Sequence, residues 1–544
     1  MKAQLDPRSQ RRFFPLLLAL MLVVAACGGT ADEDTTTTTA TDGGETTTTA
    51  AGGETTTTAA DDGDAAAGGT LEVAILDEIN GFDPMAFSAV NFPYIKNLYD
   101  SLIEYTPEGE PIPWLATDWD IAEDNTSVTV TLRDDVVFHS GAALDSAAVA
   151  TTLEKAAHPE DGKNLFATMS IVENWETPDG QTVVVNFNAP VADRQITDLL
   201  QFLSVLDPTG IDTVVDTPAG SGPFMLESRR LGEEIRLVAN PDYWGDGPFL
   251  DGINLRIFDD ADAASAALEN GDVDLIYNVS GREGKRLADA GFNLVEGPGP
   301  LVQVLRINPN NGPFQNQTFR QAMAFLLNRE AILEVGYAGI GEVTVLPWAP
   351  TSPAADRSYD EVYAYNPERA QELLAESGLS EAELEDFSML VNGASADSVA
   401  ISQIFQADLA GVGIDIELDL FEGAEFTDRL LGGEFDVVFG GVGNVQKFPT
   451  RLATNSIFRT SANPIVGEPM FPEYVEAIER VNATLGPEDA IQEAYDNLNA
   501  VIMDLAFGLA TNTFQFGLMI VSPEIGGITL DIDNILVGRT MTKG

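Results

Sequence analysis

The composition of the chain changes at residue 70, and this change limits which residues can build a fold. Residues 28–69 consist only of Thr, Ala, Gly, Asp and Glu, and the unit GGETTTTAA occurs twice in succession, at 43–51 and 52–60. The same stretch has nine acidic residues and no basic residue. Such side chains bury too little apolar surface to offset the entropy of ordering them, and like charges repel. We therefore predict a disordered, extended tether at 28–69 and a folded part that begins at Thr70.

The residues before the tether resemble a bacterial export signal. Basic residues precede an apolar run from Phe13 to Ala26, which is shorter than the ~20 apolar residues of a membrane-spanning helix. Val24–Gly28 resembles a lipobox, in which Cys27 becomes lipidated and then forms the new N-terminus; Cys27 is the only Cys of the chain. The alternative is an ordinary secretory peptide with a chance Cys, and both Sec and twin-arginine export stay open. We expect a lipoprotein signal peptide at 1–27 and a protein that is lipid-anchored outside the cytoplasm.

Charge and composition exclude several classes of function. The chain has 544 residues, with 86 Asp and Glu against 28 Lys and Arg, and a formal net charge of −58. Nucleic acids and anionic membrane surfaces require basic patches, so neither is expected as a partner. Two His and one Cys leave no zinc site of the usual His/Cys kind, and we predict no cofactor. At ~100–200 residues per domain, the chain is long enough for two to four domains.

Strands and helices alternate from Thr70 onward. Apolar residues at every second position or in short runs predict strands at 71–75, 127–132, 182–187 and 414–420. Apolar residues at helical spacing predict helices at 94–105, 145–157, 262–270, 317–327, 367–377 and 397–410. This pattern indicates an α/β protein with mixed sheets. No apolar segment after Ala26 reaches membrane-spanning length.

Short motifs are spread in order over more than four hundred residues. They are Phe82-Asp83-Pro84, Asn97–Leu102, Pro113–Trp119, Leu132–Gly141, Gly220–Phe224, Asn240–Trp244, Asn308-Pro309, Pro313-Phe314, Arg320–Ala322 and Asn328–Ile332. Together they resemble the family 5 extracellular solute-binding proteins of ABC transporters, the group of oligopeptide, dipeptide and nickel binders.

The resemblance implies a two-lobe periplasmic-binding-protein fold of type II, cluster C, with an extra subdomain in the first lobe. The implied parts are lobe I at 70–112 and 219–307, the subdomain at 113–218, lobe II at 308–512, and a return to lobe I at 513–544. In this family the ligand lies in the cleft between the lobes, which close on it about a hinge.

The resemblance also implies ligand-binding positions. The loop after the first strand supplies Phe87, Ser88, Ala89 and Val90, and the subdomain supplies an aromatic residue at Phe166, for which a place in the core is the alternative. Trp348 is a further candidate, because the prolines on either side of it hold its ring rigidly for stacking.

The segment 434–449 is the most informative about the ligand. Its candidate residues are Gly441, Val442, Gly443, Asn444, Val445 and Lys447. Peptide binders of the family carry a Trp where Val442 stands, and an Asp that anchors the peptide α-ammonium where Val445 stands. A buried ammonium without a carboxylate costs several kcal/mol, about 3–5 kcal/mol for an unpaired buried charge. We therefore expect a ligand without an essential α-amine, such as a modified peptide or a glycoside. For Lys447, an exposed loop lysine is the alternative.

No enzyme motif stands out. The chain has no GxSxG after a strand and no GxxxxGK[ST] loop, so an ATPase must be a separate subunit. His139 and His158 lie away from the implied cleft, and we expect no metal there. We predict a non-enzymatic, monomeric receptor that delivers a peptide or other organic solute to the permease and ATPase subunits of an ABC importer. The alternative is a sensing or adhesion lipoprotein with the same fold.

Overall fold

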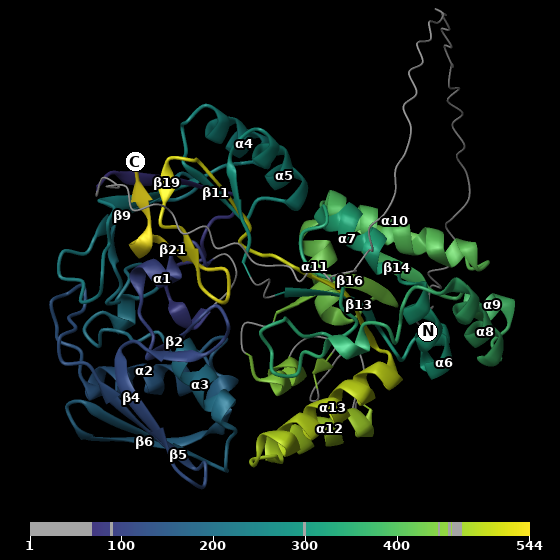
Figure 1. The fold of residues 1–544 in the computed structure, drawn as a ribbon, viewed down its shortest axis with the longest axis horizontal. Helices are drawn as coiled ribbons and strands as arrows, with labels where there is room; N and C mark the ends of the chain where they lie inside the picture. The colour runs from purple at the N-terminus through teal and green to yellow at the C-terminus, as the bar shows by residue number, and fades with distance from the viewer. Residues whose placement is uncertain (1–67, 87–90, 298–300, 444–446, 455–457, 460–470) are drawn as a thin grey trace, which may run out of the picture. The chain divides into compact units, whose positions relative to one another are not determined.

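The computed structural model describes residues 68–86, 91–297, 301–443, 447–454, 458–459 and 471–544 (Figure 1). The predicted signal peptide at 1–27 and almost all of the tether at 28–69 lie outside the described residues. The fold proper begins with a strand at Thr70, as the change in composition predicts.

A seven-stranded mixed sheet is built from segments that are far apart in the sequence. Its order is β12 (Asn293–Val295), β18 (Met519–Val521), β11 (Leu275–Tyr277), β1 (Thr70–Ile75), β10 (Gly252–Ile257), β9 (Glu234–Ala239) and β8 (Phe224–Arg230). β1 runs parallel to β10 and β11, and the other neighbours are antiparallel. Helices α4 (Ala261–Glu269) and α5 (Gly281–Asp289) pack against β11, β12 and β18, and the short helix α1 (Ile95–Leu98) contacts β8.

A four-stranded antiparallel sheet lies within the predicted subdomain. Its order is β4 (Ala116–Ile121), β5 (Ser127–Leu132), β7 (Thr182–Phe187) and β6 (Val172–Asp179). Val128, Val130 and Leu132 are buried while the residues between them are not, so one face of the sheet packs inward. Helix α2 (Ser146–Ala157) packs against β6 and β7, and α3 (Asp193–Phe202) follows.

A five-stranded mixed sheet forms the other large part of the fold. Its order is β15 (Glu417–Phe421), β14 (Ser388–Asn392), β16 (Val437–Gly443), β13 (Leu301–Ile307) and β17 (Gly508–Phe514). β13 pairs with β16 and β17, so residues 301–307 belong to this sheet and not to the first lobe, where the family resemblance places them. The change of sheet therefore comes before Leu301, because strand pairing, which the sequence does not show, decides where β13 belongs.

Eight helices follow β13 in the described part of the chain. They are α6 (Gln317–Leu326), α7 (Arg329–Tyr337), α8 (Pro367–Glu376), α9 (Glu381–Leu384), α10 (Ala396–Gly411), α11 (Gly423–Gly432), α12 (Pro472–Ala483) and α13 (Glu488–Leu505). Figure 1 shows α12 and α13 side by side, and α7 beside α10. Smaller two-stranded sheets pair β2 (Ile103–Tyr105) with β3 (Pro111–Pro113), β19 (Ile525–Gly526) with β22 (Thr542–Lys543), and β20 (Thr529–Leu530) with β21 (Leu536–Val537).

Side-chain caps mark where many of these helices begin. Asp145, Asp260, Asn316 and Asn328 each accept a hydrogen bond from a backbone N–H in the first turn of the helix that follows. Asn366 does the same for α8, which also has Pro at its first position. Such caps satisfy N–H groups that lack a partner within the helix, and each is worth ~1 kcal/mol. Local sequence therefore explains the starts of these helices.

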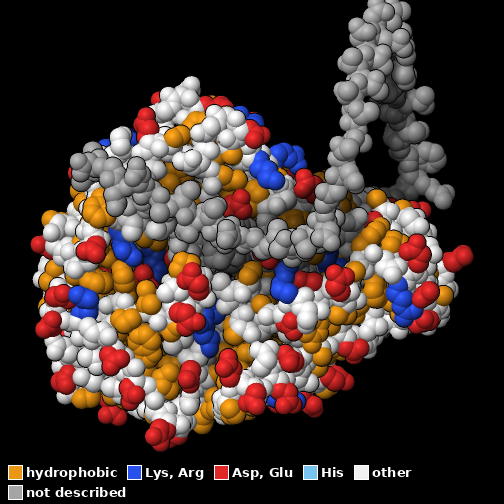
Figure 2. All heavy atoms as spheres, in the orientation of Figure 1, with side chains coloured by type: hydrophobic (Ala, Val, Ile, Leu, Met, Phe, Trp, Pro, Cys, Tyr) orange, Lys and Arg blue, Asp and Glu red, His pale blue; other side chains and the backbone are white. Residues whose placement is uncertain are grey.

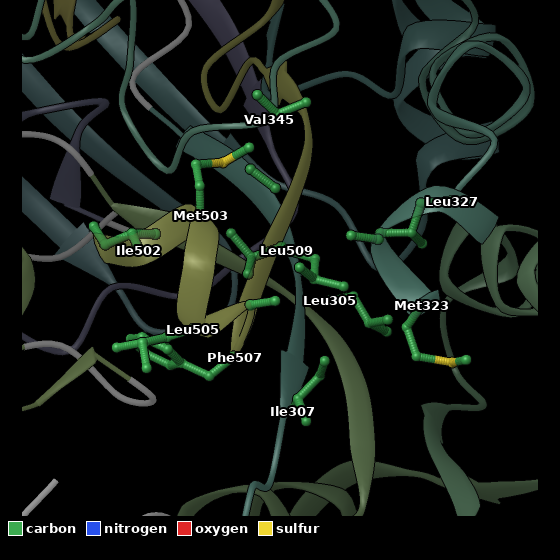
Figure 3. Close-up of a cluster of buried hydrophobic side chains, with 14 of the residues drawn as sticks. Leu305, Ile307, Met323, Leu327, Val345, Ile502, Met503, Leu505, Phe507 and Leu509 are labelled. Carbon is green, nitrogen blue, oxygen red and sulfur yellow. The ribbon is translucent and has the colours of Figure 1, made fainter. Parts of the chain in front are cut away.

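Two large clusters of buried apolar side chains hold the fold together. The first core lies on the seven- and four-stranded sheets and includes Leu71, Val73, Val128, Val185, Ile196, Leu199, Phe224, Ile253, Ile535 and Leu536. The second core lies on the five-stranded sheet and includes Leu305, Ile307, Met323, Val345, Trp348, Phe448, Ile502, Phe507 and Leu509. Figure 3 shows side chains from β13, α6, α13 and β17 meeting in the second core.

Several of the motifs noted in the sequence meet at one buried carboxylate. Asp100 is 3% exposed and accepts hydrogen bonds from Trp114 Nε1 (2.8 Å), Ser221 Oγ (2.8 Å) and Trp244 Nε1 (3.2 Å). These partners come from three motifs, of which the first lies more than a hundred residues before the other two. Asp100, Trp114, Ser221 and Trp244 thus join distant segments, which gives these motifs a structural role in the first core.

The predicted helix at 94–105 is wrong after Leu98. Tyr99 has an extended backbone (φ −131°, ψ 147°), and 103–105 form strand β2. Gly222 packs so closely on this turn that a Cβ there would lie 2.5 Å from the Leu98 carbonyl carbon. The tertiary contacts of Asp100 and Gly222 therefore end the helix, although the apolar spacing continues.

The described part of the chain has no helix that is both long and apolar enough to cross a bilayer. Asp and Glu side chains are spread over the visible face in Figure 2, as expected for a chain with 86 acidic residues. The acids therefore mainly coat the surface, where water and salt screen them.

Candidate functional site

About half of the predicted ligand-binding residues lie in the described part of the structure. Phe166, Trp348, Gly441, Val442, Gly443 and Lys447 can be placed. Phe87, Ser88, Ala89, Val90, Asn444, Val445 and the lipidation site Cys27 lie outside the described residues.

Phe166 lies in the turn after α2 with its ring 40% exposed. Its backbone N–H donates to the carbonyl of Gly162. The next residues, Ala167 and Thr168, line a pocket together with Asp198 and Phe448. The exposed ring is therefore beside this pocket in the sequence, and a contact between Phe166 and a ligand stays a prediction.

Trp348 lies in the second core, whereas its flanking prolines predict a ring held for stacking on a ligand. Its side chain is 3% exposed, and its Nε1 donates a hydrogen bond to Asn499 Oδ1 at 2.6 Å. Asn499 in turn donates to the carbonyl of Ala354 at 2.9 Å. The hydrogen bond to Asn499 therefore holds Trp348 in the core, and stacking on a solute would require the ring to leave the core.

Gly441, Val442 and Gly443 form the end of β16. Val442 is fully buried in the second core, whereas Gly441 and Gly443 are exposed. Successive strand residues point to opposite faces, so the side chain at 442 faces the core. A Cβ at Gly441 would lie 2.9 Å from the ring of Phe514 on β17, and this close approach accounts for the glycine.

Lys447 is 1% exposed, so the alternative of an exposed loop lysine is wrong. Its Nζ lies 2.7 Å from Asp533 Oδ1, and neither side chain is exposed to solvent. A buried ammonium requires a charged partner, and a segment far along the chain supplies it. The predicted contact of Lys447 with a ligand must therefore compete with this ion pair.

The residue after Lys447 is also bound to a buried carboxylate. The backbone N–H of Phe448 donates to Asp198 Oδ2 at 2.8 Å, and Tyr105 donates its hydroxyl to Asp198 Oδ1 at 2.9 Å. Burial raises the pKa of the Asp198 carboxyl, while the Phe448 N–H and the nearby Arg194 act to lower it. Asp198 is thus held as a hydrogen-bond acceptor between two parts of the fold.

A pocket of about 990 Å³ opens beside Asp198 and Phe448. One wall comes from the part of the chain that holds the four-stranded sheet: Ala167, Thr168, Ser170, Ile171, Asn188, Ala189, Pro190, Val191, Gln195 and Asp198. The other wall comes from the part that holds the five-stranded sheet: Phe448, Thr450, Ala453, Arg459, Ile478, Glu479, Asn482, Ala483 and Leu485. Its volume is at the upper end of the ~300–1,000 Å³ range of small-molecule sites.

The pocket lining mixes apolar surface with hydroxyl, amide and charged groups. Thr450 Oγ1 donates to Asn482 Oδ1 at 2.7 Å, and Asn188 Nδ2 donates to the carbonyl of Ser170 at 2.8 Å. Such bonds fix the polar groups in direction, and the apolar residues supply contact area. The arrangement suits the binding of a polar organic solute through hydrogen bonds.

Sequence reasoning missed these pocket residues, although it came close to two of them. Phe166 and Lys447 are neighbours in sequence of Ala167 and Phe448, which line the pocket. The segment from Ile478 to Leu485 carries no motif, and only the packing of α12 brings it to the pocket. Proximity to the segment 434–449 was the one usable signal.

The histidines are engaged in local contacts. His139 Nε2 lies 3.0 Å from the carbonyl oxygen of Gly222, and burial lowers the pKa of this imidazole. His158 lies at the end of α2, with Nδ1 2.9 Å from Asp161 Oδ2. Among the residues that the structure describes, no group of three or more His, Cys, Asp or Glu could hold a metal ion.

Comparison with known proteins gives consistent results. The model of the bacterial extracellular solute-binding proteins, family 5 (middle), matches residues 110–462. The nickel-binding periplasmic protein of Escherichia coli (strain K12) is 25% identical over 369 residues, which cover 63% of this chain and 69% of the relative. Di/tripeptide-binding protein 2 of Pseudomonas aeruginosa (strain UCBPP-PA14) is 26% identical over 402 residues, which cover 68% of this chain and 75% of the relative.

Among solved structures, that of NikA from Brucella suis in complex with Fe(III)-EDTA is similar over 88% of this chain and 100% of that chain. The TM-score is 0.77 and the sequence identity is 24%. This confirms the predicted fold class, a mixed α/β periplasmic-binding-protein fold of cluster C. The family model matches more than half of the chain, and the fold agrees. This chain therefore belongs to the family 5 bacterial extracellular solute-binding proteins, which bind solutes and are not enzymes.

Proposed function

We propose that this chain is the lipid-anchored solute receptor of an ABC importer. It captures a peptide or another organic solute outside the cytoplasm and delivers it to separate permease and ATPase subunits. The observation that carries the proposal is the pocket of about 990 Å³, whose two walls come from parts of the chain with different cores, in a member of a solute-binding family. A site between two such parts can close on a ligand, and closure gives the permease a state to recognise.

The proposal divides the chain into two lobes at the changes of sheet. Lobe I comprises the seven- and four-stranded sheets and the C-terminal segment from β18 onward, and lobe II comprises the five-stranded sheet with its helices. The connections from β12 to β13 and from β17 to β18 then join the lobes. The four-stranded sheet corresponds to the extra subdomain at 113–218.

The same proposal includes a class of ligand. A relative from Escherichia coli is named for nickel and one from Pseudomonas aeruginosa for di- and tripeptides, so the family name alone leaves the solute open. In this chain the positions of the peptide-anchoring Trp and Asp hold Val442 and Val445, and the neighbouring Lys447 is paired with Asp533. We therefore propose a solute that does not depend on an α-amine and is bound through hydrogen bonds to hydroxyl and amide groups.

Calorimetry with peptides tests this ligand class. We expect that N-acetylation of a di- to pentapeptide changes its affinity by less than about threefold, because no buried carboxylate is lost as a partner. Native mass spectrometry of the purified protein would identify a solute that co-purifies, and the binding of this solute in the calorimeter is the positive control. Tight binding of free peptides that is abolished by N-acetylation would contradict the proposed class.

Lipid anchoring is tested by replacing Cys27 with Ala. We expect the membrane-bound fraction of the protein to fall more than about tenfold, because the tether has no basic residue that could hold it on an anionic bilayer. Fractionation and immunoblotting measure this fraction, with Thr35→Ala in the tether as the matched control. An unchanged membrane-bound fraction for Cys27→Ala would contradict the anchor.

A further inference from the structure

Two consecutive residues, Lys447 and Phe448, connect the two cores. The side chain of Phe448 is 3% exposed and belongs to the second core. Its backbone N–H donates to Asp198 on α3, a helix whose residues Ile196 and Leu199 belong to the first core. One residue is therefore packed in one core and hydrogen-bonded to the other.

Lys447 repeats this arrangement through a different carboxylate. Its carbonyl accepts a hydrogen bond from Ser352 Oγ at 3.4 Å, close to Trp348 of the second core. Its Nζ is paired with Asp533, and Ile535, two residues further along the chain, belongs to the first core. Asp198 and Asp533 come from separate segments beside the first core, and they bind the successive residues Phe448 and Lys447 beside the second core.

The Lys447–Asp533 ion pair contributes more to fixing the relative position of the two cores than to the free energy of unfolding. Burial removes water from both charges of the Lys447–Asp533 pair, and a well-packed apolar pair of similar volume is often at least as stable. The ion pair and the Phe448–Asp198 hydrogen bond are directional, however. Each buried charge is compensated only when Lys447 meets Asp533 and the Phe448 N–H meets Asp198. Such contacts define one relative position of the two cores more sharply than apolar packing does.

The same residues line the ligand pocket. Asp198 and Phe448 are on opposite walls of the pocket, and their hydrogen bond of 2.8 Å joins the two walls. Thr450, two residues further on, also lines it. A movement that separates the cores would therefore break this bond and open the pocket at the same time.

We propose that Lys447 and Phe448 form a latch, together with Asp533 and Asp198, that holds the two cores in the closed arrangement. The latch joins the walls of the pocket, so solute capture and latch formation stabilise each other. The link to solute capture rests on the proposed function, whereas the effect on the closed arrangement does not. The latch also explains why an amine so close to the expected ligand loop is buried.

Distances between spin labels test the latch without any ligand. In the full chain with Cys27→Ser, labels at Glu154→Cys on α2 and Glu476→Cys on α12 are the only thiol sites, and both native side chains are exposed. Pulsed electron paramagnetic resonance then measures the distribution of distances between the two labels, which reports the separation of the two cores. In the labelled protein with the native latch residues, we expect one dominant short distance between the two labels.

The key variant is Asp533→Leu, which keeps the volume similar and leaves the Lys447 ammonium buried without its charged partner. We expect the population at longer distances to rise at least about fivefold. The matched control is Glu372→Leu, which removes the carboxylate of an exposed pair with Arg369 at 2.7 Å within α8 and should leave the distribution unchanged. An unchanged distribution in the latch variant would overturn the proposal.

A second variant covers the case in which Asp533→Leu does not fold. Asp198→Asn keeps the size of the side chain but removes the charge that strengthens its bond to the Phe448 N–H. We expect the long-distance population to rise about twofold, with a normal far-ultraviolet circular dichroism spectrum. An unchanged distribution in folded Asp198→Asn would also overturn the proposal. Because no solute is added, a failed search for a ligand would contradict the proposed function and leave this result intact.

Discussion

Replacing Asp100 with Ala is expected to lower the free energy of unfolding by about 3 to 5 kcal/mol. The carboxylate is 3% exposed and accepts hydrogen bonds from Trp114, Ser221 and Trp244. Its removal leaves the buried Ser221 hydroxyl and the half-buried indole N–H groups of Trp114 and Trp244 without their acceptor, and an unsatisfied buried donor costs ~1–3 kcal/mol. The loss should also loosen the edge-to-face contact of Trp114 and Trp244, whose ring centroids are 5.0 Å apart.

Urea denaturation followed by tryptophan fluorescence measures this loss, because two of the five Trp residues are partners of Asp100. Asp134→Ala is the matched control, since Asp134 is exposed and a surface substitution changes stability by ~0.5 kcal/mol or less. Asp100→Asn should fall between the two, because the amide keeps one acceptor oxygen. Equal stability of Asp100→Ala and Asp134→Ala would show that the motifs meet at Asp100 without depending on it.

Replacing Asp531 with Asn is expected to stabilise the protein at pH 8 and to have little effect at pH 4. Burial, followed by the negative charge of Asp533, raises the pKa of the Asp531 carboxyl to about 7, although Lys96 acts in the opposite direction. The folded state therefore binds this proton more tightly than the unfolded state. Its stabilising effect is fully present below pH ~4 and is lost as the pH rises through 7.

The expected gain for Asp531→Asn at pH 8 is roughly 2 to 4 kcal/mol. Asn can still accept the backbone N–H groups of Asp533 (2.9 Å) and Ile535 (2.7 Å) that Asp531 Oδ1 binds. Chemical denaturation at several pH values between 4 and 8 measures the difference, with Asp134→Asn as the control. A difference that stays constant with pH would show that Asp531 does not titrate in this range.

Much of the local structure could be predicted because it depends on local patterns. The strands at 127–132 and 182–187 alternate, and the helices at 145–157 and 397–410 have caps at or beside their predicted starts. The helix predicted at 94–105 is wrong after Leu98, because the contacts of Asp100 and Gly222 are long-range. A periodic pattern shows which residues can be buried, but it does not show which distant segment buries them.

The candidate site was harder to predict for the same reason. The family resemblance indicated the segment 434–449, and Phe448 of this segment lines the pocket. The burial of Lys447 depends on Asp533, which is not its neighbour in sequence, so an exposed loop lysine was a reasonable alternative. Trp348 shows the converse, because its flanking prolines suggested a ring held for stacking on a ligand, while Asn499 offered a buried partner. Pairing partners, more than residue types, decided each of these outcomes.

The position of β1 in the first sheet has a consequence for export. β1 is the first strand of the fold, yet it lies inside its sheet and pairs with β10 and β11, which begin only at Gly252 and Leu275. Contacts between residues so far apart in sequence form slowly, because a long loop must close first. The N-terminal part of the chain therefore cannot complete its sheet while it is the only part that has been synthesised. Such late closure of the sheet suits the Sec route, one of the two export routes that stay open, because that route requires an unfolded chain.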